Sequence, residues 1–224
     1  MISVSQLTTA SLANLFDHTQ LHADARRADF EKLCAESREY GFKMVAINPA
    51  PVALCKELLA GTPVHVGAAI GFPLGQNGVE SKVFETQQAV REGASEVDMV
   101  VNLGDVKNGD FDAVEKEIEA LKKAAGDNVL KVIVETCYLT QEEKIRLCEC
   151  VTQAGADYIK TSTGFGTAGA TLEDIALFRA HIGPQVKVKA AGGIRTREDL
   201  EAFCNAGCDR LGCSAAVKVL REKG

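Results

Sequence analysis

Short apolar runs alternate along the chain with longer stretches in which charged and apolar residues recur at helical spacing. Seven of the apolar runs are rich in β-branched residues and have the length of strands. They span 43–48, 64–70, 96–102, 130–136, 157–162, 186–191 and 209–214. A further run at 13–19 has a less regular pattern and is expected to form the first strand.

Six amphipathic stretches between these runs predict helices. They span 29–41, 80–94, 110–126, 140–155, 171–183 and 196–207. In 110–126 the apolar residues recur at steps of three and four, which places them on one face of a helix. They are Phe111, Val114, Ile118 and Leu121.

Residues typical of helix ends support these boundaries. Thr140 and Thr171 are each followed three positions later by an acidic residue, Glu143 or Asp174, as in a capping box. Four stretches are closed by a glycine, which readily adopts the left-handed conformation that ends many helices. These glycines are Gly41, Gly93, Gly155 and Gly207.

Strands that alternate with helices indicate a parallel sheet of the α/β class. Eight such units in 224 residues predict a single (β/α)₈ TIM barrel with a short N-terminal helix, formed as one domain by residues 1–224. An open doubly wound sheet is the alternative. In both folds the chemistry lies at the carboxyl ends of the strands.

Composition narrows the class of protein. Hydrophobic residues make up 46% and charged residues 25%, and the net charge of −6 argues against a nucleic-acid or anionic-membrane surface. No run approaches the ~18 apolar residues of a membrane span. None of the eight cysteines forms a C-x-x-C pair, and the N-terminal residues lack the pattern of a signal peptide. We therefore expect a cytoplasmic protein with reduced thiols.

Four charged residues stand near the ends of otherwise apolar runs. They are Asp17, Asp98, Lys160 and Lys189. A lysine attacks a carbonyl only when neutral, which at pH 7 requires its pKa to fall by ~3 units from ~10.4. The sixth and seventh strands of a barrel are neighbours, so the Lys189 ammonium could disfavour a second charge on Lys160. Asp98 could then transfer protons, as a Schiff-base aldolase requires.

Simpler interpretations of the same residues stay open at this point. A strand-end lysine is usually a surface or salt-bridged residue, and an aspartate such as Asp98 is often a structural hydrogen-bond partner. Lys131 and Lys187 lie nearer the starts of their strands and are expected to be solvated at the opposite mouth of the barrel. Glu135 is either catalytic or a support for the site.

Six stretches of the chain, in this order, resemble the deoxyribose-phosphate aldolase family nearly end to end. They are DHT at 17–19, GFPLG at 71–75, EVDMVVNLG at 96–104, LKVIVETCYLT at 130–140, AGADYIKTSTGF at 154–165 and VKAAGGIRT at 188–196. The resemblance implies a (β/α)₈ barrel that reversibly cleaves 2-deoxy-D-ribose 5-phosphate to D-glyceraldehyde 3-phosphate and acetaldehyde. It implies a lyase without metal or other cofactor, and we expect a homo-oligomer, either a dimer or a tetramer.

The resemblance also assigns roles to particular residues. The Schiff-base lysine falls on Lys160, the second lysine on Lys189 and the proton-transferring aspartate on Asp98. Asp17 matches an aspartate that supports Lys189 or the substrate hydroxyl groups. Phosphate is expected in the loops after the sixth, seventh and eighth strands, where glycine lets backbone N–H groups approach an anion. The residues expected there are Thr163, Gly164, Gly192, Gly193, Gly212 and Ser214.

Four positions depart from the usual pattern of the family. Ala46 stands where many relatives have cysteine, and Ala191 where serine is frequent. Ala215 replaces a common second serine, which puts one phosphate contact in doubt. Lys187 replaces a residue that is usually small, and nothing in the sequence explains it.

Competing functions predict different observations. Residues 164–169 spell G-x-G-x-x-G, but a dinucleotide site requires the motif to open a helix directly and to precede an acidic strand end. A metal-dependent aldolase would need ligands, and His18 and His22 lack an H-E-x-x-H setting. A non-catalytic barrel would bind sugar phosphates without turnover, and another Schiff-base aldolase would use a different donor.

Overall fold

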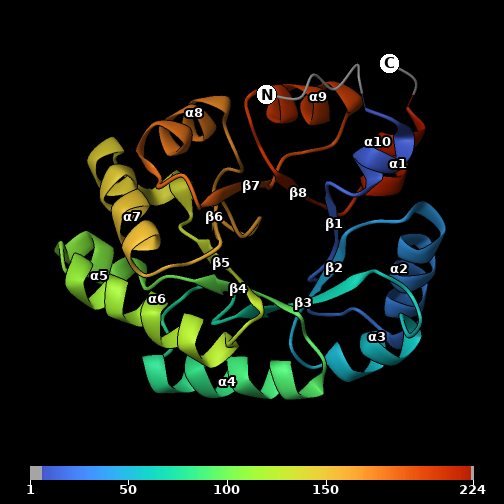
Figure 1. The fold of residues 1–224 in the computed structure, drawn as a ribbon, viewed down its shortest axis with the longest axis horizontal. Coiled ribbons are helices and arrows are strands. Elements are labelled where there is room, and N and C mark those ends of the chain that lie inside the picture. Colours follow the sequence, from blue (N-terminus) through green and yellow to red (C-terminus); the bar gives the residue numbers. More distant parts are fainter. Residues whose placement is uncertain (1–6, 223–224) are drawn as a thin grey trace.

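The computed structural model describes residues 7–222, which form a closed ring of eight parallel strands surrounded by helices (Figure 1). The strands are β1 (Phe16–Gln20), β2 (Met44–Ile47), β3 (His65–Ile70), β4 (Glu96–Val100), β5 (Val129–Ile133), β6 (Tyr158–Lys160), β7 (Lys187–Ala191) and β8 (Arg210–Cys213). Neighbours in sequence are neighbours in the sheet, and β8 pairs with β1. The predicted (β/α)₈ barrel is confirmed, and the open doubly wound sheet is wrong.

Helices lie on the outside of the ring, with α1 before the first strand and the others after the strands. They are α1 (Thr9–Ala13), α2 (Arg27–Tyr40), α3 (Val52–Leu58), α4 (Val79–Glu92), α5 (Leu103–Asn108), α6 (Phe111–Ala125), the 3₁₀ turn η2 (Thr136–Tyr138), α7 (Gln141–Gln153), α8 (Leu172–His181), α9 (Arg197–Asn205) and α10 (Ala216–Arg221). The six predicted helices correspond to α2, α4, α6, α7, α8 and α9. The pattern did not reveal α3, α5, η2 and α10, because elements of this length do not complete two helical turns.

The first strand begins later than the sequence indicates. Helix α1 extends to Ala13, within the run expected to be strand, and β1 starts at Phe16. The Thr8 hydroxyl accepts a hydrogen bond of 3.1 Å from the Ser11 backbone N–H and caps this helix. The short N-terminal helix is therefore confirmed, and the start of the first strand is corrected.

The helix ends mostly follow the expected chemistry. Thr140 and Glu143 form a reciprocal capping box. The Thr171 hydroxyl caps α8 by accepting from the Asp174 N–H, but the Asp174 carboxylate is 2.6 Å from Lys144 Nζ rather than bonded to the cap backbone. All four expected C-terminal glycines have positive φ, with values of 70° for Gly41, 113° for Gly93, 70° for Gly155 and 104° for Gly207.

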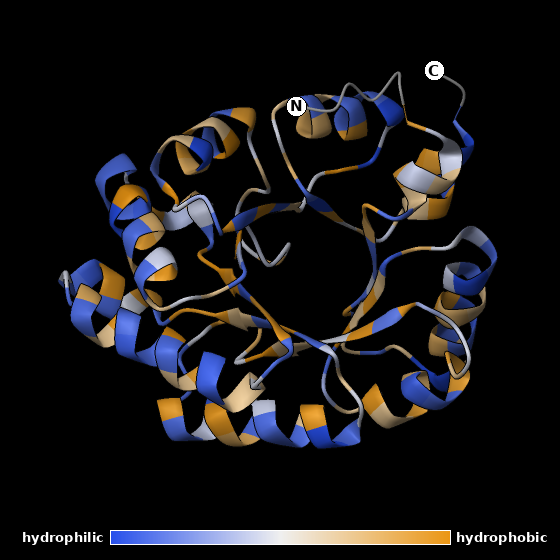
Figure 2. Cartoon of the chain, viewed as in Figure 1, coloured by the Kyte–Doolittle hydropathy of each residue, from blue (hydrophilic) through white to orange (hydrophobic). Residues whose placement is uncertain are grey.

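The apolar core lies between the strands and the helices. Strand residues that point outward, such as Val45, Val97 and Ile159, are fully buried against the inner faces of the helices. In α6 the predicted stripe is buried at Val114 and Ile118, as it is at Leu121, and only partly at Phe111. The helices carry both apolar and polar residues along their length, as elements with one buried face do (Figure 2).

The inside of the barrel differs from this core because many inward-facing positions are charged. Bulky aliphatic side chains usually fill a TIM barrel in layers. Here seven ionisable side chains inside the ring are each at most 5% exposed: Asp17, Glu96, Asp98, Lys131, Lys160, Lys189 and Arg210. Buried charges require partners, so this set is expected to form an ionic network.

Between residues 7 and 222, no helix combines the length and apolar character needed to cross a membrane. The eight cysteine thiols are all free, and seven of them are buried.

Candidate active site

Lys160 and Lys189 lie side by side at the centre of the barrel. They are directly paired in the register of β6 and β7, so both side chains point inward at the same height. Lys160 Nζ donates to Asp98 Oδ2 at 2.8 Å, and Lys189 Nζ donates to the same oxygen at 2.6 Å. The structure therefore brings together the two lysines and the aspartate that the sequence singles out.

The pKa of the Lys160 amine is shifted toward neutral pH. Burial is the largest cause of the shift, and repulsion from Lys189 adds to it. Together they lower the pKa of Lys160 to about 8, although the negative charge of Asp98 acts to raise it. Sequence reasoning named the cationic neighbour as the reason for a low pKa. That neighbour contributes, but loss of hydration inside the barrel contributes more.

Asp98 is held as a carboxylate between three ammonium groups. Burial alone would raise the pKa of Asp98, but Lys131, Lys160 and Lys189 hold it well below its usual value. Its Oδ1 accepts from Lys131 Nζ at 2.8 Å, opposite the oxygen that the other two lysines share. Asp98 therefore stays ionised, and it can accept a proton only transiently before it passes that proton on.

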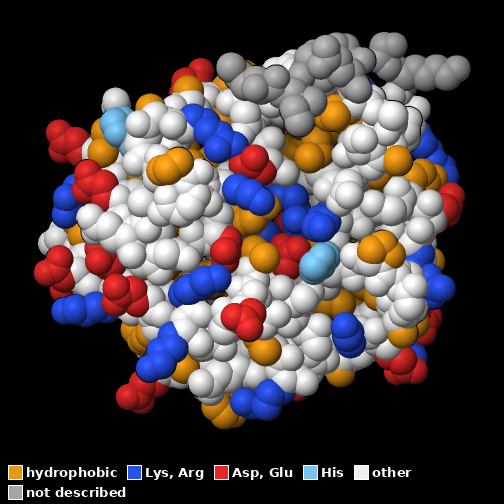
Figure 3. All heavy atoms as spheres, viewed as in Figure 1, with side chains coloured by type: hydrophobic (Ala, Val, Ile, Leu, Met, Phe, Trp, Pro, Cys, Tyr) orange, Lys and Arg blue, Asp and Glu red, His pale blue; other side chains and the backbone are white. Residues whose placement is uncertain are grey.

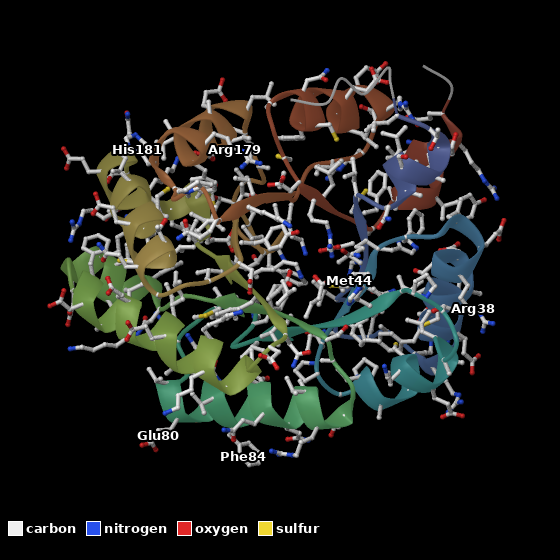
Figure 4. The ribbon with its side chains drawn as sticks, viewed as in Figure 1. Arg38, Met44, Glu80, Phe84, Arg179 and His181 are labelled. Carbon is white, nitrogen blue, oxygen red and sulfur yellow. The ribbon has the colours of Figure 1, made fainter. Side chains whose placement is uncertain are left out.

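Lys131 is buried, so the expectation that it is solvated at the opposite mouth was wrong. It is directly paired with Asp98 in the register of β4 and β5, so its side chain points into the barrel, where it is 0% exposed. Its Nζ also lies 3.4 Å from Sδ of Met44, which Figure 4 places inside the ring of strands. Lys187, at the start of β7, is exposed as expected.

Asp17, on β1, contacts Lys189, on β7. Its Oδ2 lies 2.5 Å from Lys189 Nζ, and its Oδ1 accepts from Arg210 Nε at 2.8 Å. Burial alone would raise the pKa of Asp17, but Lys189, Arg210 and Lys131 lower it below its ordinary value. Of the two roles considered for Asp17, this geometry favours support of Lys189.

Two buried charges were missed by sequence reasoning. Glu96 Oε2 lies 2.5 Å from Lys131 Nζ and accepts from Arg210 Nη2 at 2.9 Å. Glu96 is two residues before Asp98, and Arg210 is the first residue of β8. Side chains two apart in a strand share a face, so the inward position of Asp98 already implied that Glu96 points inward.

A pocket of about 530 Å³ opens beside Lys160. It is lined by all six residues that the sequence assigns to phosphate: Thr163, Gly164, Gly192, Gly193, Gly212 and Ser214. Gly192 and Gly193 have φ of 81° and 86°, a conformation that glycine adopts readily. Arg195 and Lys218 also line the pocket and were not predicted, because an exposed cation in a loop or short helix has no distinctive sequence pattern.

Glu135 fixes the loop that forms one wall of this pocket. It is 3% exposed, and its carboxylate accepts hydrogen bonds from the Thr163 backbone N–H, at 3.2 Å, and from the Thr163 hydroxyl. Its backbone φ of 54° is rare for a residue with a side chain. Of the two interpretations given to Glu135, the contacts favour that of a support.

Two of the departures from the family pattern lie at the pocket. Ala191 and Ala215 line the pocket, whereas Ala46 is buried on β2. Ser214 remains on the pocket wall beside Ala215. Arg195 and Lys218 line the same pocket.

The features behind the competing functions have other structural explanations. The G-x-G-x-x-G stretch ends at Gly169, and α8 starts only at Leu172, so the motif does not open a helix. Its Gly169 allows a close approach, because a Cβ there would lie 2.3 Å from the Gly192 carbonyl oxygen. Over the described residues 7–222, no three His, Cys, Asp or Glu side chains form a group suited to a metal ion.

The chain matches a known protein family over most of its length. The family model described as DeoC/LacD family aldolase matches residues 11–208. The chain belongs to this family. Curated DeoC/LacD relatives named deoxyribose-phosphate aldolase are 53% identical in Clostridium botulinum (strain Alaska E43 / Type E3) and 52% in Thermoanaerobacter sp. (strain X514). The matches cover 96% and 95% of this chain, and 97% and 96% of those proteins.

The fold agrees with that of a solved structure described as a deoxyribose phosphate aldolase. A deoxyribose phosphate aldolase from Aeropyrum pernix, described as having a unique tetrameric structure, superposes with a TM-score of 0.90 at 33% identity. The match covers 97% of this chain and 93% of that one. Family membership therefore extends over the whole barrel and includes the strands that carry the two lysines.

Proposed function

We propose that this DeoC/LacD family aldolase is a deoxyribose-phosphate aldolase that cleaves 2-deoxy-D-ribose 5-phosphate through a Schiff base on Lys160. The single observation that carries this proposal is the buried Lys160 amine, with a pKa lowered to about 8 by burial, at the wall of a glycine-rich pocket. Relatives more than half identical along the chain are named for this activity. The proposed substrates are therefore a small sugar phosphate and acetaldehyde.

The reaction begins at the neutral amine. Lys160 Nζ attacks the C1 aldehyde of the open-chain sugar, and the carbinolamine loses water to give an iminium. Acetaldehyde contains C1 and C2 of the sugar, so the bond that breaks is C2–C3. Its electron pair moves through C2 to the iminium nitrogen, and the C3 hydroxyl loses its proton to become the aldehyde of glyceraldehyde 3-phosphate.

The second half of the reaction returns the amine. The enamine takes a proton at C2, and addition of water to the resulting iminium releases acetaldehyde and free Lys160. Asp98, Lys189 and ordered water carry these protons, since Asp98 Oδ2 contacts both lysine nitrogens. The iminium itself accepts the electrons, so the step needs no metal or other cofactor.

The phosphate is proposed to bind at the glycine wall of the pocket. Gly164, Gly192 and Gly193 would offer backbone N–H donors, with Gly212 and Ser214 on the facing loop. Thr163 would line this site while its own N–H and hydroxyl donate to Glu135. Arg195 and Lys218 supply positive charge in a chain whose net charge is −6. This arrangement would hold the substrate with its aldehyde end toward Lys160.

We also propose a cytoplasmic homo-oligomer. Free thiols at all eight cysteines suit a reducing compartment. On the outer surface of α4, Glu80, Phe84, Gln87 and Arg91 form one exposed row, and Phe84 is 61% exposed. Figure 4 shows Glu80 and Phe84 directed away from the barrel. A two-fold axis would place Glu80 of one subunit opposite Arg91 of the other, so the row is complementary to itself.

The proposed function is tested by turnover of 2-deoxyribose 5-phosphate, followed through the release of glyceraldehyde 3-phosphate. We expect activity that a chelator leaves unchanged. Binding of the sugar phosphate without cleavage would instead favour a non-catalytic barrel, and cleavage only of other aldol adducts would favour a different donor.

A further inference from the structure

Six of the seven charges buried in the barrel close into a ring in which the sign alternates. In ring order they are Asp17, Lys189, Asp98, Lys131, Glu96 and Arg210, which returns to Asp17. The shortest nitrogen–oxygen distances around the ring are 2.5, 2.6, 2.8, 2.5, 2.9 and 2.5 Å. Each carboxylate thus stands between two cations, and each cation between two carboxylates.

Lys160 is the seventh charge and lies outside the ring. Its only ion-pair partner among residues 7–222 is Asp98, whose Oδ2 already accepts from Lys189. The ring holds three carboxylates and three cations, so it is neutral without Lys160. A protonated Lys160 therefore leaves one uncompensated positive charge in a space from which water is largely excluded, which is unfavourable.

Other ionisable groups near the ring do not change this count at neutral pH. His65 Nδ1 lies 3.6 Å from Glu96 Oε1, and burial, partly opposed by Glu96, lowers the pKa of His65. The Tyr158 ring lies beside Lys131 and Arg210, and burial raises its pKa. Lys187 is exposed at the start of β7. At the pocket, His22, Arg195 and Lys218 are exposed, so solvent screens them.

Lys131 and Arg210, the two ring cations other than Lys189, stay protonated. Burial alone would lower the pKa of Lys131, but Asp98, Glu96 and Asp17 raise it above its ordinary value. Asp17 and Glu96 likewise raise the pKa of Arg210 against the effect of burial. Acidic and basic side chains also gather near the centre of the face seen in Figure 3, over the barrel.

We propose that Glu96, Lys131 and Arg210 are positioning residues that set the number of charges inside the barrel, so that Lys160 is the surplus ammonium and loses its proton first. None of the three lines the substrate pocket. They act through Asp98 and Asp17, which join them to the two catalytic lysines. This inference deepens the proposed Schiff-base chemistry and rests on it.

The ring predicts shifts of opposite sign when its charge is changed. Lys131→Met removes a cation, so Lys160 should keep its proton to balance Asp98 and Glu96. Glu96→Gln removes a carboxylate with little change of shape, so the interior should have two surplus cations and Lys160 should lose its proton more readily. Lys131→Met combined with Glu96→Gln restores the original balance.

The test is an NMR titration of the full-length protein with ¹³C-labelled lysine Cε, in which Lys160→Met assigns the Lys160 signal. We expect the Lys160 midpoint to rise by about one pH unit in Lys131→Met, to fall by about one in Glu96→Gln, and to return near the original in the double variant. The acidic limb of the pH profile of kcat/KM should move with it.

Midpoints that do not move, or that move in the same direction in both single variants, would overturn the inference. If Lys131→Met does not fold, comparison of Glu96→Gln with the double variant still tests the inference. Glu96→Gln should lower the Lys160 midpoint, and the double variant should leave it near the original value. The titration needs no turnover. An unmodified chain that fails to cleave the sugar phosphate would therefore refute the proposed function, whereas unshifted midpoints in an active enzyme would refute only the role of the ring.

Discussion

At the scale of single residues, the proposed chemistry requires a buried amine that can still gain and lose a proton. Lys160 meets this requirement because it is only 4% exposed and has one carboxylate partner, which two other lysines also contact. Such an amine is held in a place that disfavours its protonated form. Its presence therefore costs stability below the pH at which it becomes neutral.

Lys160→Met is expected to stabilise the fold at pH 7. The folded pKa of Lys160 is about 8, below its unfolded value of 10.5, so the unfolded chain binds more protons between these values and stability rises with pH there. Below pH 8 the full cost is present, and its removal should raise the free energy of unfolding by about 3 kcal/mol, since one pKa unit corresponds to about 1.4 kcal/mol. Urea unfolding at pH 7 and pH 10 measures this, and a variant less stable than the original at pH 7 would contradict it.

The phosphate wall gives a second prediction at this scale. Arg195→Ala and Lys218→Ala should each raise KM for 2-deoxyribose 5-phosphate about tenfold, because each removes one charge-assisted contact to the phosphate. KM for 2-deoxyribose without phosphate is the matched control and should not change. Equal effects on both sugars would place the phosphate elsewhere.

Sequence reasoning at the residue level succeeded where a motif or a strand end marked the side chain. Lys160, Lys189, Asp98 and Asp17 were all found in this way. Lys131 was wrongly expected to be solvated at the opposite mouth of the barrel, because its position along the strand was taken as a measure of its depth in the barrel. Its burial depends on the stagger between β4 and β5, which sets it opposite Asp98 and which the sequence does not encode locally.

At the scale of elements, a buried ion pair ties α4 and α6 to the strands that form the site. Lys82 Nζ lies 2.5 Å from Glu117 Oε1 and donates to the carbonyl oxygens of Gly75 and Val100. The other carboxylate oxygen accepts from the Asn102 N–H at 3.0 Å. This pair holds the loop after β3 and the end of β4, two residues beyond Asp98.

Breaking this pair on one side should destabilise the protein strongly. Lys82→Met leaves Glu117 buried without its partner and is expected to lower the free energy of unfolding by about 3–5 kcal/mol. Lys82→Met combined with Glu117→Leu removes both charges and should recover most of that loss. Thermal or urea unfolding of the three proteins decides, and a double variant no more stable than Lys82→Met would contradict the account.

The elements that the sequence predicted are those long enough to repeat their pattern. Helices of nine residues or more, such as α6 and α9, were all expected, and their caps and terminal glycines marked their ends. The helices missed, α3, α5 and α10, have six or seven residues and depend on contacts with the barrel for their stability.

At the scale of the whole molecule, closure of the barrel brings the two halves of the site together. Asp17 on β1 reaches Lys189 on β7 and Arg210 on β8 because β8 pairs with β1. Closure leaves the outer faces of the helices for the proposed assembly. The predicted topology of eight βα units therefore determines both where the chemistry lies and which surface remains for assembly.

Phe84→Arg should weaken the proposed assembly. The change places a cation at the centre of the α4 row, where the two-fold partner presents Gln87 and Arg91. We expect sedimentation velocity to show a shift toward smaller species, with turnover per subunit retained. Ser81→Arg is the control, because Ser81 is exposed on α4 outside this row. An unchanged sedimentation profile for Phe84→Arg would exclude α4 as the contact.

The central claim is that Lys160, and no other lysine, carries the Schiff base. It is tested most directly by treatment with acetaldehyde and borohydride, followed by peptide mapping of the reduced protein. We predict an ethyl group on Lys160 alone, and none in Lys160→Met. An ethyl group on Lys189 or Lys131 in place of Lys160 would contradict the account.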